Sequence, residues 1–150
     1  MKIVVINGPN LNMLGIREPE IYGNADYSAL CEYIKKICSD NNIADEIFQS
    51  NSEGEIIDRI HKAYYENADG IIINPAAYTH TSIAIMDALK TVMIPTVEVH
   101  LTDIYKREPF RRNSYIKIAC AGEFYGKGFE SYRDAVLFLL NYEKQRNKTI

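Results

Sequence analysis

Three side chains that can exchange protons with a substrate lie in polar segments of this sequence, each of which follows an apolar run. Tyr22 lies in "NGPNLNMLGIREPEIYG", His80 in "NPAAYTHTS" and His100 in "EVHLTDIYKREPFRR". Histidine and tyrosine are both used as general acids or bases. Arginine and amide side chains accompany them, a combination that suits a small anionic ligand rich in hydroxyl groups. The residue types therefore predict a site for acid–base chemistry.

The same segments carry no motif for a metal or a nucleotide. His80 and His100 lie in different segments, and no carboxylate pair accompanies them, so a metal site is not expected. The "GKG" at 126–128 is too short for a dinucleotide fingerprint, and no Walker-type loop is present. The first polar segment has no Ser or Thr before Tyr27, which argues against a phosphate cradle of the flavodoxin kind. We expect catalysis without a cofactor.

An alternation of apolar and amphipathic runs must position these segments. Apolar, β-branched runs predict strands over 2–6, 44–50, 70–74, 95–100 and 115–120. Apolar residues at helical spacing, with Asp26 as a cap for the first run, predict helices over 26–42, 52–70, 79–92 and 128–145. Strands that alternate with helices in this way indicate a parallel sheet covered on both faces.

The predicted fold is α/β, a flavodoxin-like three-layer sandwich in one domain over residues 1–150, with a five-stranded sheet of order 2-1-3-4-5. In this order the winding direction reverses between strands one and three, and ligands bind at the carboxyl ends there. The three polar segments follow strands one, three and four, which are neighbours. They should therefore share one rim and one pocket.

Composition limits the expected partners and compartment. The 150 residues are 47% hydrophobic, and the net charge of -3 gives no electrostatic case for nucleic acid. No run approaches the roughly 18 apolar residues of a membrane span, and the N-terminus lacks the layout of a signal peptide. Cys31, Cys38 and Cys120 lack metal-ligand spacing, so we expect buried free thiols in the reducing cytoplasm.

Three long segments resemble the signature segments of type II 3-dehydroquinate dehydratases: "INGPNLNMLGIREPEIYG", "NPAAYTHTSIAI" and "VEVHLTDIYKREPFRRNS". They occur in the right order with similar spacing, and the similarity extends over nearly the whole chain. The resemblance implies a flavodoxin-like fold, loss of water from 3-dehydroquinate to give 3-dehydroshikimate in the shikimate pathway, and a dodecamer of four trimers. A biosynthetic and a catabolic role are both compatible with it.

The resemblance also implies how the reaction starts. Tyr22 matches the base, which acts as a phenolate, although an ordinary phenol is ionised in only about one molecule in a thousand at pH 7. Arg17 matches the cation that favours the charged form, and Arg111 adds to the same field. Asn10 matches the residue that holds a water against the enolate oxygen. The segment from Arg17 to Tyr22 is expected to close over the substrate as a lid.

His100 matches the general acid that protonates the departing hydroxyl. Glu98 precedes it by two residues, and alternation along a strand places both side chains on one face, where the carboxylate can orient and charge the imidazole. The remaining substrate contacts implied by the resemblance are the side chains of Asn74, His80 and Arg111, the backbone amides of Leu101 and Thr102, and Asp87 from a neighbouring subunit. Asp87 follows His80 by seven residues, so we expect both on one face of the helix predicted over 79–92.

Other interpretations are weighed against this one. A flavodoxin-like binding module or phosphorelay receiver would need acidic residues where this chain has Asn7 and Asn74. An assembly protein that has lost catalysis would be more credible without Arg17, Tyr22 or His100. The pair of Glu98 and His100 could also be purely structural, and "REPFRR" could be a solvated basic turn. Departures from the family pattern are Thr102, often Ser, the pair Arg112 and Asn113, where histidine is common, and the loose segment 122–135; none of them touches the proton chemistry.

Overall fold

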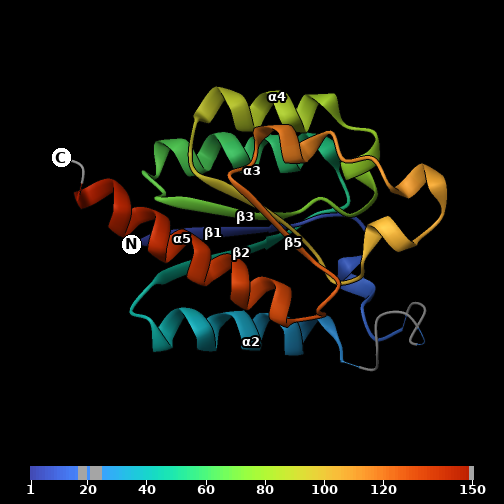
Figure 1. Cartoon of the computed structure of the whole chain (residues 1–150), viewed down its shortest axis with the longest axis horizontal. Helices are drawn as coiled ribbons and strands as arrows, with labels where there is room; N and C mark the ends of the chain where they lie inside the picture. The colour runs from blue at the N-terminus through green and yellow to red at the C-terminus, as the bar shows by residue number, and fades with distance from the viewer. Residues whose placement is uncertain (17–19, 21–24, 149–150) are drawn as a thin grey trace.

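The centre of the molecule is one sheet of five parallel strands in the order β2-β1-β3-β4-β5 (Figure 1). The computed structural model describes residues 1–16, 20 and 25–148. The strands are β1 (Lys2–Asn7), β2 (Ala44–Gln49), β3 (Gly70–Asn74), β4 (Thr96–His100) and β5 (Gly122–Tyr125). The predicted fold class and strand order are therefore confirmed.

Two layers of helices cover the sheet (Figure 1). The helices α2 (Tyr27–Asp40) and α5 (Glu130–Lys148) lie on one face, and α3 (Glu53–Tyr65) and α4 (Ile83–Val92) lie on the other. Successive strand residues point to opposite faces, so Ile3 and Val5 enter the core under α2 and α5, whereas Val4 and Ile6 enter the other. Burial on both faces explains why the central strands are continuously apolar.

Side-chain caps fix where the helices begin. The Asp26 carboxylate accepts a hydrogen bond from Ala29 N at 2.8 Å, as predicted for the start of α2. Ser82 accepts the amide of Ile85 and starts α4 at Ile83, not at 79 as predicted. The preceding residues form a separate 3-10 turn, η2 (Ala76–His80). His80 therefore lies in this turn and not in the first turn of a helix, as the predicted range 79–92 would have it.

The predicted fifth strand over 115–120 is also wrong. These residues form a 3-10 turn, η5 (Ile116–Ala119), because the Ser114 hydroxyl accepts the amide hydrogen of Lys117 and closes a turn at its start. Ile116 is fully buried but Ile118 is 63% exposed, so the apolar spacing that imitates a strand serves a turn. The strand β5 follows directly and pairs with β4, with His100 opposite Tyr125.

The cysteines match their prediction in part. All three are unpaired; Cys38 is buried, whereas Cys31 and Cys120 are half-buried. Burial raises the pKa of the Cys38 thiol to about 12, so it remains protonated.

Among the helices within the described ranges, none is long and apolar enough to cross a membrane.

Candidate active site

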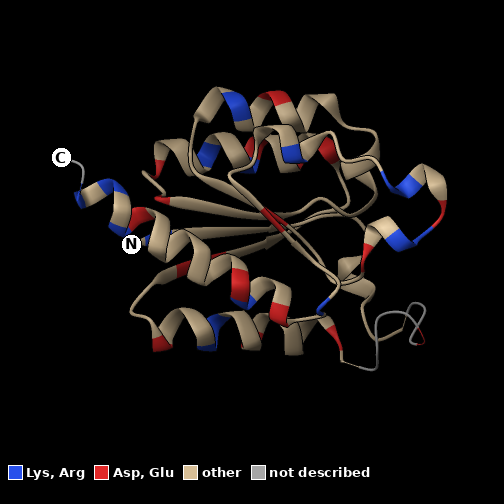
Figure 2. Cartoon of the chain, in the orientation of Figure 1, with Lys and Arg blue, Asp and Glu red and all other residues tan. Residues whose placement is uncertain are grey.

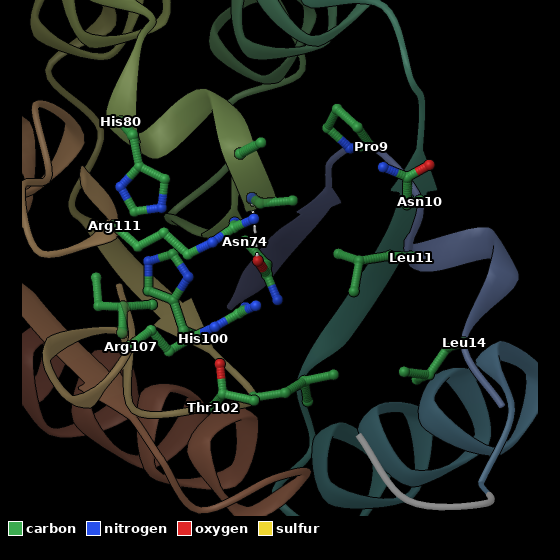
Figure 3. Close-up of a pocket in the computed structure, with 14 residues that line it drawn as sticks. Pro9, Asn10, Leu11, Leu14, Asn74, His80, His100, Thr102, Arg107 and Arg111 are labelled. Atoms are coloured by element: carbon green, nitrogen blue, oxygen red, sulfur yellow. Dashed lines mark hydrogen bonds between the residues drawn. The ribbon is translucent and has the colours of Figure 1, made fainter. Parts of the chain in front are cut away.

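A pocket with a volume of about 110 Å³ opens at the carboxyl ends of β1, β3 and β4 (Figure 3). The predicted rim is therefore the place where the three polar segments meet. Its lining residues are Pro9, Asn10, Leu11 and Leu14 from the first segment, Asn74, Ala76, Ala77 and His80 from the second, and His100, Leu101, Thr102, Ile104, Arg107 and Arg111 from the third.

The segments after β1 and β3 are locked together by a close backbone approach at Gly8. Its amide donates to Asn74 O at 2.7 Å, and an added Cβ would lie 2.6 Å from Pro75 O, so no larger residue fits without movement. Asn10 follows with a positive φ of 69°, a conformation that asparagine tolerates, and its amide donates to Asn51. These contacts bring Asn10 to the same pocket as Asn74.

Glu98 and His100 lie side by side on β4, as the strand alternation predicts. Their side chains are 0% and 6% exposed, and His100 Nε2 lies 2.6 Å from Glu98 Oε1. A carboxylate can only accept, so Nε2 carries the hydrogen of this bond. Nδ1 is then the ring nitrogen that Glu98 does not engage. The pair is built so that His100, which lines the pocket, can exchange a proton with a bound molecule while the carboxylate supports its charge.

Two hydroxyl groups complete the surroundings of Glu98. Thr79 Oγ1 donates to Glu98 Oε1 at 2.6 Å, and Ser114 Oγ lies 2.9 and 2.8 Å from the two carboxylate oxygens. Burial alone raises the pKa of Glu98, but the hydrogen bond and charge of His100, with these hydroxyls, outweigh it and hold that pKa below its ordinary value. Glu98 is therefore ionised at neutral pH although it is fully buried.

His80 is oriented by the segment that precedes η5. Its Nδ1 lies 2.7 Å from Asn113 O, and because a carbonyl can only accept, Nδ1 carries the hydrogen. Burial lowers the pKa of His80, and the nearby positive charges of His100 and Arg111 lower it further, against the opposing effect of the Asn113 carbonyl. A neutral His80 with Nδ1 protonated presents Nε2 as an acceptor, which suits a hydroxyl group of a ligand.

Positive charge reaches the pocket from the segment after β4, which contains η3 (Ile104–Lys106) and η4 (Pro109–Arg111). Figure 2 shows several Lys and Arg residues, in blue, in this segment at the end of the molecule beyond the sheet. Arg107 and Arg111 line the pocket and pair with Glu108, whereas the exposed Arg112 bonds Arg107 O. The segment is therefore more than a solvated basic turn, and its two lining guanidinium groups suit an anion.

The remaining predicted residues lie in three different situations. Leu101 and Thr102 follow His100 in the chain and line the pocket, and Thr102 is labelled in Figure 3. Asp87 lies exposed on α4 and does not line this pocket. His80 precedes α4, which begins only at Ile83, so the prediction that the two residues share one helical face is wrong. Arg17 and Tyr22 lie outside the described residues, as does the predicted lid between them apart from Glu20.

Several contributors were not predicted from the sequence. Leu11, Leu14 and Ile104 give the pocket an apolar part, and their only signal is membership of the same polar segments. Nothing in the local pattern distinguishes Thr79 or Ser114 from other hydroxyl residues. Within the part of the chain that the structure describes, no group of three or more His, Cys, Asp or Glu side chains could hold a metal ion.

Comparison with known proteins gives a consistent match over most of the chain. The family model described as dehydroquinase class II matches residues 1–140. A 3-dehydroquinate dehydratase from Caldicellulosiruptor saccharolyticus is 61% identical over 131 residues, 87% of this chain and 90% of the relative. One from Clostridium perfringens is 57% identical over 146 residues, 97% of this chain and all of the relative.

Solved structures agree with the sequence relatives. The crystal structure of a type II dehydroquinase from Butyrivibrio crossotus superposes with a TM-score of 0.91 at 51% identity and covers 93% of this chain and 97% of that chain. A type II dehydroquinase from Propionibacterium acnes gives a TM-score of 0.88 at 37% identity, over 92% of this chain and 94% of that chain.

Proposed function

This chain belongs to the class II dehydroquinase family, and we propose that its pocket removes water from 3-dehydroquinate to give 3-dehydroshikimate through an enolate. The activity is that of a hydro-lyase of the shikimate pathway, carried by one catalytic domain over residues 1–150. The observation that carries the proposal is the buried pair of Glu98 and His100 at a pocket lined by two arginines, since this elimination needs an acid and its substrate is an anion that positive charge attracts.

The reaction begins with removal of the proton next to the ketone. We assign this step to Tyr22 as a phenolate and the stabilisation of its charge to Arg17, an assignment supported by the resemblance of their segment to the family signature. Asn10 holds a water against the enolate oxygen, so that a hydrogen-bond donor faces the atom where negative charge develops. Its position at the pocket, fixed through Asn51, supports this role.

The reaction ends with loss of the hydroxyl group as water. His100 donates the proton from Nδ1, while its Nε2–H remains hydrogen-bonded to Glu98. The ionised carboxylate stabilises the imidazolium before the proton is transferred. Thr79 and Ser114 keep that carboxylate ionised and in place. The product carries a double bond conjugated with the ketone. Before the next turnover Tyr22 must lose the proton that it took, and His100 must regain the proton that it gave.

Substrate is held by groups of matching chemistry. Asn74, His80 and Arg111 bind hydroxyl groups, and the backbone amides of Leu101 and Thr102 bind the carboxylate, roles supported by their common pocket. Asp87 is assigned to the site of a neighbouring subunit, which its exposure outside its own pocket supports. The corresponding assembly is a dodecamer of four trimers. Three unpaired cysteines support a reducing, cytoplasmic location.

The test is conversion of 3-dehydroquinate by the purified full chain in the presence of a metal chelator and without added cofactor. We expect the ultraviolet absorbance of a conjugated enone to appear, and borohydride to trap no adduct, because no lysine is assigned to a Schiff base. Absence of turnover by folded protein, or inactivation by borohydride in the presence of substrate, would overturn the proposal.

A further inference from the structure

A buried chain of hydrogen bonds reaches Asn74 from the core side of the pocket. Tyr132, on α5, is fully buried, and its hydroxyl lies 2.9 Å from Asn74 Nδ2 and 2.7 Å from Asn7 Oδ1. Asn7 and Asn74 are register partners at the carboxyl ends of β1 and β3, so one hydroxyl joins the ends of both strands. Asn7 Nδ2 in turn lies 3.4 Å from the hydroxyl of Tyr27.

The donor and acceptor of each hydrogen bond in this series can be assigned by starting at Asn74, which lines the pocket. The backbone N–H of Ala76 can only donate, and it lies 3.2 Å from the Asn74 side chain, so the atom that faces it is the oxygen Oδ1. Nδ2 of Asn74 must then face Tyr132, whose oxygen accepts. The single hydroxyl hydrogen of Tyr132 is left for Asn7 Oδ1, and the amide of Asn7 is thereby oriented as well.

This arrangement leaves Asn74 with a defined hydrogen-bonding capacity. The bonds to Tyr132 and Ala76 use one N–H and one oxygen lone pair of the side chain, so one N–H and one lone pair remain. Asn74 lies in Figure 3 between the two histidines on one side and Pro9, Asn10 and Leu11 on the other. A substrate hydroxyl, which donates and accepts, is the group that this remainder fits.

We propose that Tyr132 is a positioning residue that sets the orientation of the Asn74 amide toward the substrate. The inference rests on the proposed function, since Asn74 binds a substrate hydroxyl there. Burial raises the pKa of Tyr132 well above its ordinary value, so its hydroxyl keeps its hydrogen and the direction of the chain does not change with pH. A phenylalanine would fill the same space but would leave Asn74 Nδ2 and Asn7 Oδ1 without this partner.

The test is a double-mutant cycle on the purified full chain. Tyr132→Phe is expected to raise KM for 3-dehydroquinate by about threefold to tenfold, the loss expected for one hydrogen bond, and to change kcat by less than about twofold. In the background of Asn74→Ala the same substitution is expected to change KM by less than about twofold, because the amide through which it acts is absent.

The matched control is Tyr105→Phe, which removes a hydroxyl bonded to Glu123 and should leave KM unchanged. The proposal is wrong if Tyr132→Phe raises KM equally with and without Asn74, because the effect then acts through general loss of structure. It is also wrong if KM does not change. If the protein without any substitution does not turn over 3-dehydroquinate, that result refutes the proposed function instead.

A second measurement needs no substitution of Tyr132 and no turnover. The side-chain amide of Asn74 can be identified in the 15N-labelled chain as the resonance missing from Asn74→Ala. We expect at least one of its two protons, the one bonded to the buried Tyr132 hydroxyl, to exchange with solvent much more slowly than those of exposed asparagines. Exchange of both protons at the exposed rate would overturn the inference even if the KM result agreed.

Discussion

Replacing Glu98 by glutamine removes one charge from the site and little else. The glutamine oxygen can occupy the position of Oε1, where it still accepts from Thr79 and His100, and its NH₂ can occupy the position of Oε2. There it meets Ser114, whose hydroxyl can rotate to accept. The shape and the number of contacts are therefore kept, so Glu98→Gln should fold.

The loss of this charge destabilises the protonated form of His100, which is the acid in the proposed mechanism. A hydrogen bond to a charged partner contributes about 1.5–3 kcal/mol, and this carboxylate supports the imidazolium of His100 before it gives up its proton. At about 1.4 kcal/mol for each factor of ten, kcat should fall by about 10-fold to 150-fold. KM should change little, because Glu98 does not line the pocket.

The assay is steady-state turnover of 3-dehydroquinate at neutral pH, with Glu123→Gln as the control. Glu123 also accepts a hydrogen bond from a hydroxyl, that of Tyr105, but it does not line the pocket, so kcat should be unchanged. If Glu98→Gln keeps kcat within about threefold of the parent, the charge of Glu98 is not needed. The pair with His100 would then be structural.

The same substitution has a consequence for stability against acid. The pKa of Glu98 in the folded chain is below its ordinary value of 4.5, so its ionisation contributes stability that is fully present above that pH. This contribution is lost as the pH falls through the folded-state pKa. Chemical unfolding below pH 4.5 should therefore show a shallower loss of stability in Glu98→Gln than in the parent; identical slopes would contradict the lowered pKa.

Three further substitutions test the rest of the site. Tyr22→Phe should reduce kcat by at least about a hundredfold, as expected for loss of a general base, and normal turnover would refute that assignment. Gly8→Ala should lower the free energy of unfolding by about 1–3 kcal/mol, because the added Cβ would lie 2.6 Å from Pro75 O. The control is Gly54→Ala, which should be neutral or stabilising because the nearest atom to its added Cβ is Ser52 Oγ at 3.8 Å. Equal effects of the two substitutions would contradict the close approach at Gly8. Arg111→Ala should raise KM by about tenfold or more, while Arg112→Ala, on an exposed side chain, should leave KM within about twofold; similar values would refute the assignment of Arg111 to substrate.

The fold was predictable because the strongest signals in this sequence are local. Runs such as 70–74 are apolar on both faces, which is typical of central strands, and their alternation with helices indicates the layer order. The fifth strand was misplaced for a local reason as well. Ile116 and Ile118 imitate strand alternation, but Ser114 stabilises a turn there, and the short edge strand of 122–125 carries a weaker apolar signal.

The site was predictable as far as neighbouring residues decide it. Alternation along β4 places Glu98 beside His100, and strand order brings three loops to one rim. Contacts that join distant segments leave no such pattern: Ser114 reaches Glu98 from 16 positions away, and Tyr132 reaches Asn74 from 58. In the sequence alone, Tyr132 is one more aromatic residue on an amphipathic helix.

The most direct test of the account separates its two proton transfers. In His100→Ala, exchange of the proton next to the ketone of 3-dehydroquinate can be followed in deuterated water while product formation is followed by ultraviolet absorbance. The proposed acid role predicts that loss of the hydroxyl slows much more than exchange, because the base remains in place. Equal slowing of both steps would contradict the assignment of His100 as the acid, and with it the mechanism proposed for this pocket.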